Sequence, residues 1–245
     1  MKEQNNFLKF YQIHLNQLIL KTLIKYLIVI SVLSFFLFHI YKINLRSHHL
    51  EYNILNSNKY KTELNSQNFK DLQNCNCIIL GDSRSQGLNI KNCINFSTGG
   101  ETINLLRKKI HQLNFPDKAK ILINIGINDI LFSYSLEQIL VNFEELKKIL
   151  DLKTKNSSIY FIEIFPIDKS GFFYKKDDVN LKVNNLNNFL KSFKTSKFNN
   201  YEFLTLKGFS YEFLNENSQY SDDGIHLNKK GNELFSSILE SYINE

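Results

Sequence analysis

From residue 75 onward, short apolar runs alternate with segments in which apolar residues recur every three or four positions. Short runs bounded by turn-forming residues are typical of buried strands, and the wider spacing is typical of amphipathic helices. The pattern predicts strands at residues 77–80, 93–96, 120–125, 158–165 and 201–206. It predicts helices at residues 102–111, 136–150, 179–193 and 228–243. Strands separated by helices pair in parallel, so we expect a three-layer α/β sandwich with a mostly parallel sheet.

The first part of the chain carries one long apolar stretch at residues 22–43, and residues 26–41 within it contain no Asp, Glu, Lys or Arg. A helix of about 21 residues is roughly 30 Å long, enough to cross the hydrocarbon of a bilayer. A buried core helix is one alternative, but the domain after residue 70 has its own complete set of elements. A cleaved signal peptide is another, although its basic region is normally short and a small-x-small cleavage site is lacking here. We expect an uncleaved membrane anchor.

This anchor divides the chain into four parts. We expect a cytoplasmic tail at residues 1–21, the transmembrane helix at residues 22–43, a polar stalk or linker at residues 44–74 and the folded domain at residues 75–245. Most of the lysines near the span precede it, so the positive-inside rule places the N-terminus in the cytoplasm and the domain outside it.

The charge of the chain argues against nucleic acid as a partner. The formal net charge is +6, but the first 43 residues hold five lysines against one glutamate. The remaining domain is therefore nearly neutral, whereas a nucleic-acid-binding domain concentrates positive charge on its folded surface.

Three cysteines, Cys75, Cys77 and Cys93, leave their redox state open. In an exported protein Cys75 and Cys93 are able to pair while Cys77 lies in a strand. The odd number and the absence of metal-ligand spacing favour burial of all three as small apolar residues. We expect no metal site.

Four polar stretches lie where predicted strands end or predicted helices begin. Alone, each has an ordinary interpretation as a turn, a helix-entry loop or a helix cap. Together they supply an acyl-transfer site, in which Ser83 attacks a carbonyl, His226 takes its proton and Asp223 orients the imidazole. The developing oxyanion needs donors already in place, and the backbone N–H groups of Ser83 and Gly100 and the side-chain amide of Asn128 are available for that role.

These stretches resemble the four sequence blocks of the SGNH hydrolases, also called the GDSL esterase/lipase superfamily. The resemblance covers about residues 75–243 and rests on Gly81-Asp82-Ser83, Gly100 before Glu101-Thr102, Gly126-x-Asn128-Asp129 and Asp223-x-x-His226. It implies a flavodoxin-like sandwich, no metal or organic cofactor, and ester hydrolysis through an acyl-serine. It also implies a triad of Ser83, Asp223 and His226, and an oxyanion hole formed by Ser83, Gly100 and Asn128.

One residue departs from the family pattern, because Arg84 replaces the leucine that usually follows the serine. Arg84 either points back into the domain and pairs with a carboxylate such as Asp129 or Glu101, or faces the pocket and binds an anionic or hydroxyl-rich substrate. The replacement bears on substrate choice more than on the triad.

The function expected from these features is that of a membrane-anchored serine esterase, facing outward, that hydrolyses an acyl ester such as an O-acetyl group on a cell-surface glycan. One alternative is an O-acyltransferase that passes the same acyl group to a sugar hydroxyl. Another is a membrane-tethered glycan-binding domain that has the fold without turnover.

Overall fold

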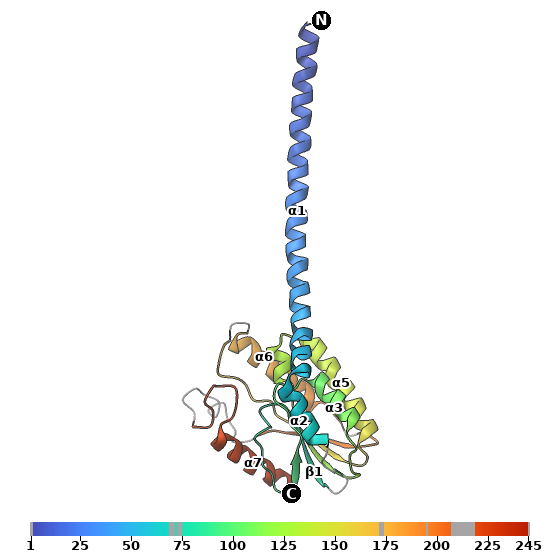
Figure 1. Cartoon of the computed structure of the whole chain (residues 1–245), viewed down its shortest axis with the longest axis vertical. Helices are drawn as coiled ribbons and strands as arrows, with labels where there is room; N and C mark the ends of the chain where they lie inside the picture. Colours follow the sequence, from blue (N-terminus) through green and yellow to red (C-terminus); the bar gives the residue numbers. More distant parts are fainter. Residues whose placement is uncertain are drawn as a thin grey trace. The chain divides into compact units, whose positions relative to one another are not determined.

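The computed structural model describes residues 2–68, 72, 75–171, 174–194, 196–206 and 219–244. The chain divides into two compact units, Met1–Arg46 and Ser47–Glu245. Helix α1 (Lys2–Asn56) contains a stretch, Ile19–His39, that is long and apolar enough to cross a membrane (Figure 1). The large apolar side chains of this stretch are exposed.

The compact unit that holds the sheet begins at Ser47, earlier than the boundary expected at residue 75. The end of α1 and helix α2 (Asn58–Asn68) both belong to it. Glu51 and Tyr60 are each only 4% exposed. The described part of the expected stalk is therefore part of the folded unit, because its polar side chains bond to buried groups of the domain. Residues 69–71, 73 and 74 lie outside the described residues.

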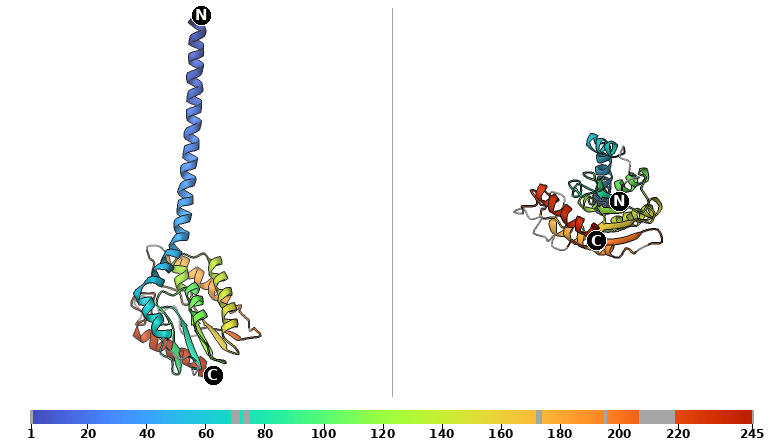
Figure 2. Two further views of the ribbon diagram at one scale, coloured as in Figure 1. Left: turned by 45° about the vertical axis from the view of Figure 1, so that its right-hand side comes forward. Right: turned by 90° about the horizontal axis from the view of Figure 1, so that it is seen from below.

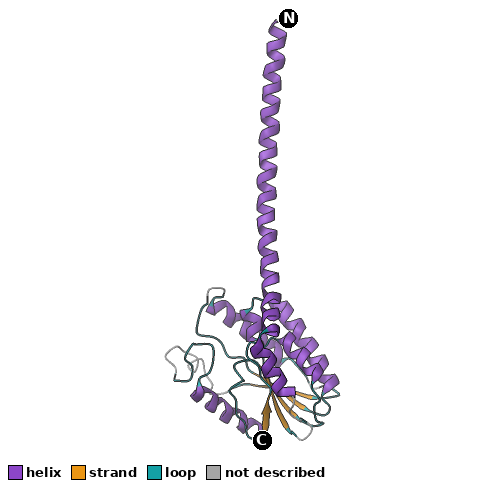
Figure 3. Ribbon diagram, in the orientation of Figure 1, coloured by secondary structure: helices purple, strands orange, loops and turns teal. Residues whose placement is uncertain are grey.

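Five strands form one parallel sheet in the order β2-β1-β3-β4-β5 (Figure 3). Their bounds are β1 (Cys77–Gly81), β2 (Cys93–Asn95), β3 (Lys120–Asn124), β4 (Ser158–Ile162) and β5 (Asn200–Leu204). This order is that of the flavodoxin-like folds and confirms the predicted architecture. Strand β4 ends before the predicted residue 165, because the backbone N–H groups of Ile164 and Ile167 donate to Asn187 and Asn180 instead of extending the strand.

The helices have recognisable start signals. Thr102 caps α3 (Ile103–Gln112) by accepting from the N–H of Leu105, and Ser135 forms a capping box with Gln138 at α5 (Leu136–Lys153). Two further predicted helices are α6 (Lys176–Lys191) and α7 (Lys229–Asn244). The short α4 (Ile127–Leu131) falls where only a turn was expected.

Alternate strand residues supply the two faces of the sheet. Ile78, Leu80 and Ile123 belong to the larger core, together with apolar residues of α3, α5 and α6. Ile79 and Leu122 belong to the other core, which they share with apolar residues of α7. The helices therefore cover both faces, with α7 across the sheet from α3 and α5 (Figures 1 and 2).

The cysteine pairing differs from both expectations. Cys77 and Cys93 form a disulfide, and Cys75 is a buried free thiol whose Sγ donates to the carbonyl of Cys77. The parallel register of β1 and β2 places Cys77 directly opposite Cys93, with their Cα atoms 4.4 Å apart. That spacing suits a disulfide, and it depends on strand pairing that the positions in the sequence do not reveal.

The order of strands also indicates where a site would lie. Ligands of open α/β sheets bind beyond the carboxyl ends of the strands, at the point where the strand order reverses. Here that point lies between β1 and β3. Ser83 follows β1 and Asn128 follows β3, so the fold brings both to this edge.

Candidate active site

Ser83 lies in a tight turn directly after β1. Gly81 ends the strand opposite Asn124 of β3, so close that a Cβ atom on Gly81 would collide with the carbonyl oxygen of Asn124. The Asp82 side chain then accepts from the N–H of Arg84 (2.9 Å), and the Asp82 carbonyl accepts from the N–H of Ser85 (3.1 Å). Asp82 is fully buried, whereas Ser83 is partly exposed. The turn thus leaves Ser83 partly exposed between two buried neighbours, Asp82 and Arg84.

Asp223 and His226 form the hydrogen-bonded pair that the sequence predicts. Oδ2 of Asp223 lies 2.7 Å from Nδ1 of His226, and Oδ1 accepts from the backbone N–H groups of Ile225 and His226. Burial raises the pKa of Asp223, but these hydrogen bonds outweigh burial and hold the pKa below its usual value. An ionised carboxylate on Nδ1 leaves Nε2 of His226 as the nitrogen able to accept a proton.

Arg84 connects the serine turn to the histidine loop. Its Nε donates to the carbonyl of Ile225 (3.0 Å), one residue before His226, and its Nη1 donates to the carbonyl of Phe165. Ser83 directly precedes Arg84 and His226 directly follows Ile225, so each is adjacent in sequence to one partner of the hydrogen bond between Arg84 and Ile225. Burial raises the pKa of Asp82, the residue before Ser83, and the charge of His226 is among the causes that lower this pKa. Between the described side chains of Ser83 and His226 themselves there is no hydrogen bond, and catalytic bonds of this kind often close only when substrate binds.

Arg84 points into the protein, the first of the two expectations for it. It is 1% exposed and its guanidinium stacks on the Phe165 ring, with Cζ 5.2 Å from the ring centroid. The expected partners were Asp129 or Glu101, but the hydrogen bonds go to backbone carbonyls. Burial lowers the pKa of Arg84 to about 10, against the opposing charges of Asp82 and Asp223. A guanidinium this deeply buried is not presented to a substrate in solution.

Gly100 and Asn128 lie on two loops that are joined directly. Gly100 has a φ of +77°, a left-handed conformation that favours glycine. Nδ2 of Asn128 donates to the carbonyl of Glu101 (3.0 Å), so the carboxamide is fixed beside the Gly100 loop. Asn128 is 8% exposed. The second hydrogen on Nδ2 can still be donated to an oxyanion.

A buried charged network supports the same loops. Glu101 pairs with Lys109 at 2.6 Å, and Lys109 also donates to the carbonyl of Phe96. The Asp129 carboxylate accepts from the backbone N–H of Ile103 at the start of α3. Burial raises the pKa of Glu101 to about 7 despite Lys109, and burial also raises the pKa of Asp129.

The sequence interpretation missed several of these residues. Lys109 lies three positions after Leu106 and beside Ile110, so helical spacing alone places it on the apolar face of α3. A lysine on an apolar face must find buried partners, so the sequence already indicated a buried charged pair at this position. Glu51, which also bonds to this region, gave no such signal, because it stands in a polar stretch far from the blocks.

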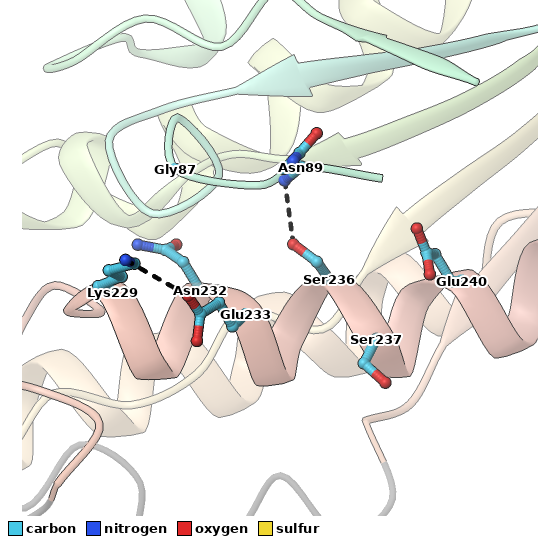
Figure 4. Close-up of a pocket in the computed structure, with 8 residues that line it drawn as sticks. All are labelled: Gly87, Asn89, Lys229, Asn232, Glu233, Ser236, Ser237 and Glu240. Atoms are coloured by element: carbon cyan, nitrogen blue, oxygen red, sulfur yellow. Dashed lines mark hydrogen bonds and ion pairs between the residues drawn. The ribbon is translucent and has the colours of Figure 1, made fainter. Parts of the chain in front are cut away.

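Two hollows open near the turn after β1 and the segment after β4. One, of about 460 Å³, lies between α7 and the loop at Gly87 and Asn89 (Figure 4). Its lining side chains from α7 are all polar: Lys229, Asn232, Glu233, Ser236, Ser237 and Glu240. The other, of about 290 Å³, is lined by residues 163–166, Leu206 and the α6 residues Asn180, Asn184 and Asn187. Neither hollow is lined by any of the six site residues predicted from the sequence. Within the described part of the chain, no three His, Cys, Asp or Glu side chains are grouped to hold a metal ion.

Comparison with known proteins agrees with the fold. The sequence model of the GDSL-like Lipase/Acylhydrolase family matches residues 74–234. A GDSL-like lipase from Bacteroides thetaiotaomicron has a TM-score of 0.58 and 17% identity, over 78% of this chain and 98% of its own. A member of the lipolytic G-D-S-L family from Veillonella parvula has a TM-score of 0.56 and 16% identity, over 69% and 98%.

Sequence relatives also include a larger protein. An N-acylneuraminate cytidylyltransferase from Streptococcus agalactiae serotype III is 25% identical over 171 residues. The match covers 69% of this chain and only 38% of that relative.

Proposed function

Because this chain belongs to the GDSL-like lipase/acylhydrolase family, we propose that it is a serine esterase whose nucleophile is Ser83. The observation that carries the proposal is the 2.7 Å contact between Asp223 and His226, on a loop bonded through Arg84 to the serine turn. The proposed triad is Ser83, His226 and Asp223. The proposed oxyanion donors are the N–H groups of Ser83 and Gly100 and the Asn128 carboxamide.

The proposed reaction has two halves. Oγ of Ser83 attacks the ester carbonyl while its proton passes to Nε2 of His226, and the oxyanion donors stabilise the tetrahedral intermediate. The C–O bond to the alcohol then breaks, and the alcohol leaves with the proton from His226. Water repeats the sequence on the acyl-serine, with His226 as base, and releases the carboxylic acid and free Ser83.

We propose an acyl group on a sugar, such as an O-acetyl ester of a cell-surface glycan, as the substrate. The name of the streptococcal relative refers to N-acylneuraminate, an acylated sugar acid.

We also propose that α1 anchors the protein with its N-terminus in the cytoplasm and the esterase domain outside. The apolar stretch Ile19–His39 is long enough to span. Four lysines lie before it or near its start, against Lys42 and Arg46 soon after it. The disulfide between Cys77 and Cys93 fits an oxidising compartment.

Turnover of a small acetyl ester such as 4-nitrophenyl acetate, by the purified chain and by Ser83→Ala, tests the reaction class. We expect the variant to lose at least about a thousandfold in kcat, and a phosphonate probe to label only the protein that retains Ser83. Equal turnover by the two proteins would remove Ser83 from its role. Product analysis with and without an acceptor glycan distinguishes hydrolysis from acyl transfer.

A further inference from the structure

Glu51, near the end of α1, makes two hydrogen bonds to the start of α3. Its Oε1 accepts from the hydroxyl of Thr102 (2.6 Å) and its Oε2 accepts from Nδ2 of Asn104 (2.9 Å). Glu51 is 4% exposed and Thr102 is fully buried. The bond to Thr102 is short and buried, and the bond to Asn104 is partly buried. Hydrogen bonds to a carboxylate that is shielded from water fix geometry firmly.

The same segment contacts the Gly100 loop at two further points. Cδ1 of Ile54 lies 3.4 Å from the position that a Cβ of Gly100 would occupy, so the isoleucine side chain lies against this glycine. The hydroxyl of Tyr60, two residues into α2, donates to Oε1 of Glu101 at 3.3 Å. Residues 51–60 therefore touch the loop at Gly100, Glu101, Thr102 and Asn104.

This loop sets the positions of two proposed oxyanion donors. The N–H of Gly100 belongs to its backbone, and the Asn128 carboxamide is held by the carbonyl of Glu101. The next residue, Asp129, accepts from the N–H of Ile103. Burial is the main cause that raises the pKa of Asp129, the Ile103 hydrogen bond lowers this pKa, and the nearby charge of Glu51 raises it further. A set of contacts thus leads from residues 51–60 to both donors, and Glu51 holds it at Thr102 and Asn104.

We propose that Glu51 is a positioning residue of the esterase, which holds the Gly100 loop and thereby the oxyanion donors Gly100 and Asn128 in place. The segment that joins the apolar helix to the sheet then supports the catalytic centre and is not merely a spacer. This inference rests on the proposed function, because it assigns Glu51 a task in stabilising the oxyanion of that reaction. Glu51 itself does not touch the reacting atoms.

The test compares kcat and KM of the full chain in detergent with those of Glu51→Ala, using 4-nitrophenyl acetate. A misplaced oxyanion donor weakens binding of the transition state and leaves ground-state binding nearly unchanged. We expect kcat to fall by about tenfold to a hundredfold while KM changes by less than about threefold. The rate of Ser83 labelling by a phosphonate probe should fall in parallel, because phosphonylation also develops charge on oxygen.

Asp151 provides the matched control. It is a half-buried carboxylate at the end of α5 that accepts from Ser196 (2.7 Å) and Tyr201 (2.9 Å), near the start of β5 and away from the carboxyl edge. Asp151→Ala removes comparable hydrogen bonds and lowers stability, but we expect its kcat to stay within about twofold of the original chain. An equal loss of kcat in both variants would show a general effect of destabilisation and would overturn the proposal.

Two further results separate the possible failures. If the original chain neither hydrolyses the ester nor labels at Ser83, the proposed function fails. If the original chain is active and Glu51→Ala keeps its kcat, only the role of Glu51 fails. Should Glu51→Ala fold poorly, Asn104→Ala removes one of the two donors to Glu51, and we expect it to lower kcat by about threefold to tenfold with KM unchanged. An unchanged kcat in Asn104→Ala would then count against the proposal.

Discussion

Arg84 shows how one residue can join separate parts of a site. Its side chain contacts the carbonyls of Phe165 and Ile225, which belong to segments far apart in the chain. A leucine in place of Arg84 would have no donor for either carbonyl. The loop that carries His226 is thus held by an interaction that depends on the arginine side chain.

We expect Arg84→Leu to lower kcat by about one to two orders of magnitude, because the His226 loop loses its bond to the serine turn. Two buried carbonyls left without donors cost about 1–3 kcal/mol each, so the free energy of unfolding should also fall. Steady-state kinetics and chemical unfolding check both effects. Added guanidinium ion should restore part of the activity of Arg84→Ala, and full activity in Arg84→Leu would contradict this role.

Asp82 predicts a pH dependence of stability. Burial raises its pKa from 3.8 to about 6, and its Oδ2 has no hydrogen-bond partner among the described residues. The folded protein therefore binds this proton more tightly than the unfolded chain does. The stability from this proton is complete below pH 3.8 and is lost as the pH rises to about 6.

Asp82→Asn keeps an oxygen to accept from the N–H of Arg84 but cannot ionise. As the pH rises from about 4.5 to about 7.5, we expect the stability of the variant relative to the original chain to increase, because only the original chain loses the proton. Urea unfolding at the two pH values measures this. A stability difference that is the same at both would show that Asp82 does not titrate in the raised range.

At the level of elements, the disulfide is the covalent bond that holds β2 to β1. It spans 16 positions of sequence and closes a loop whose constraint on the unfolded chain is worth about 3 kcal/mol. We expect Cys93→Ser to lower the free energy of unfolding by about that amount and to leave kcat nearly unchanged. Unfolding of the original chain in the presence and in the absence of a reductant gives the same comparison. Cys75→Ser, which breaks no disulfide, serves as the control.

The sequence was informative about elements because their signals are local. Apolar runs predicted all five strands, and the helical spacing that begins at residue 136 predicted the start of α5 where the structure places it. The disulfide was not predictable, since the choice between Cys75 and Cys77 depends on which strand residue faces Cys93 across the sheet. The end of β4 was equally hidden, because two asparagines of α6 draw its backbone away.

The site follows the same division. The residues within each block, such as Asp223 and His226, are close in sequence, and their hydrogen bond could be expected from spacing alone. Contacts between distant segments could not be expected. Glu51 meets Thr102 across 51 positions, and Arg84 meets Ile225 across 141. Nothing in the pattern around Glu51 distinguishes a buried carboxylate from a solvated one.

At the level of the whole molecule, the location of the domain decides which esters it meets. The lysines before Ile19–His39 and near its start favour a cytoplasmic N-terminus, and the disulfide favours export of the domain. The native cysteines scarcely interfere with a thiol-labelling experiment, because two are bonded and Cys75 is 7% exposed. Introduced cysteines can therefore report the side on which each part of the chain lies.

We expect a membrane-impermeant maleimide to label Leu152→Cys in intact cells and to leave Asn5→Cys unlabelled. Leu152 is 74% exposed at the end of α5, so a thiol there is accessible wherever the reagent reaches the domain. Permeabilised cells are the control, because both variants should then react. If only Asn5→Cys is labelled in intact cells, the orientation is opposite to the proposed one and the domain lies in the cytoplasm. A glycan on the cell surface would then be excluded as its substrate.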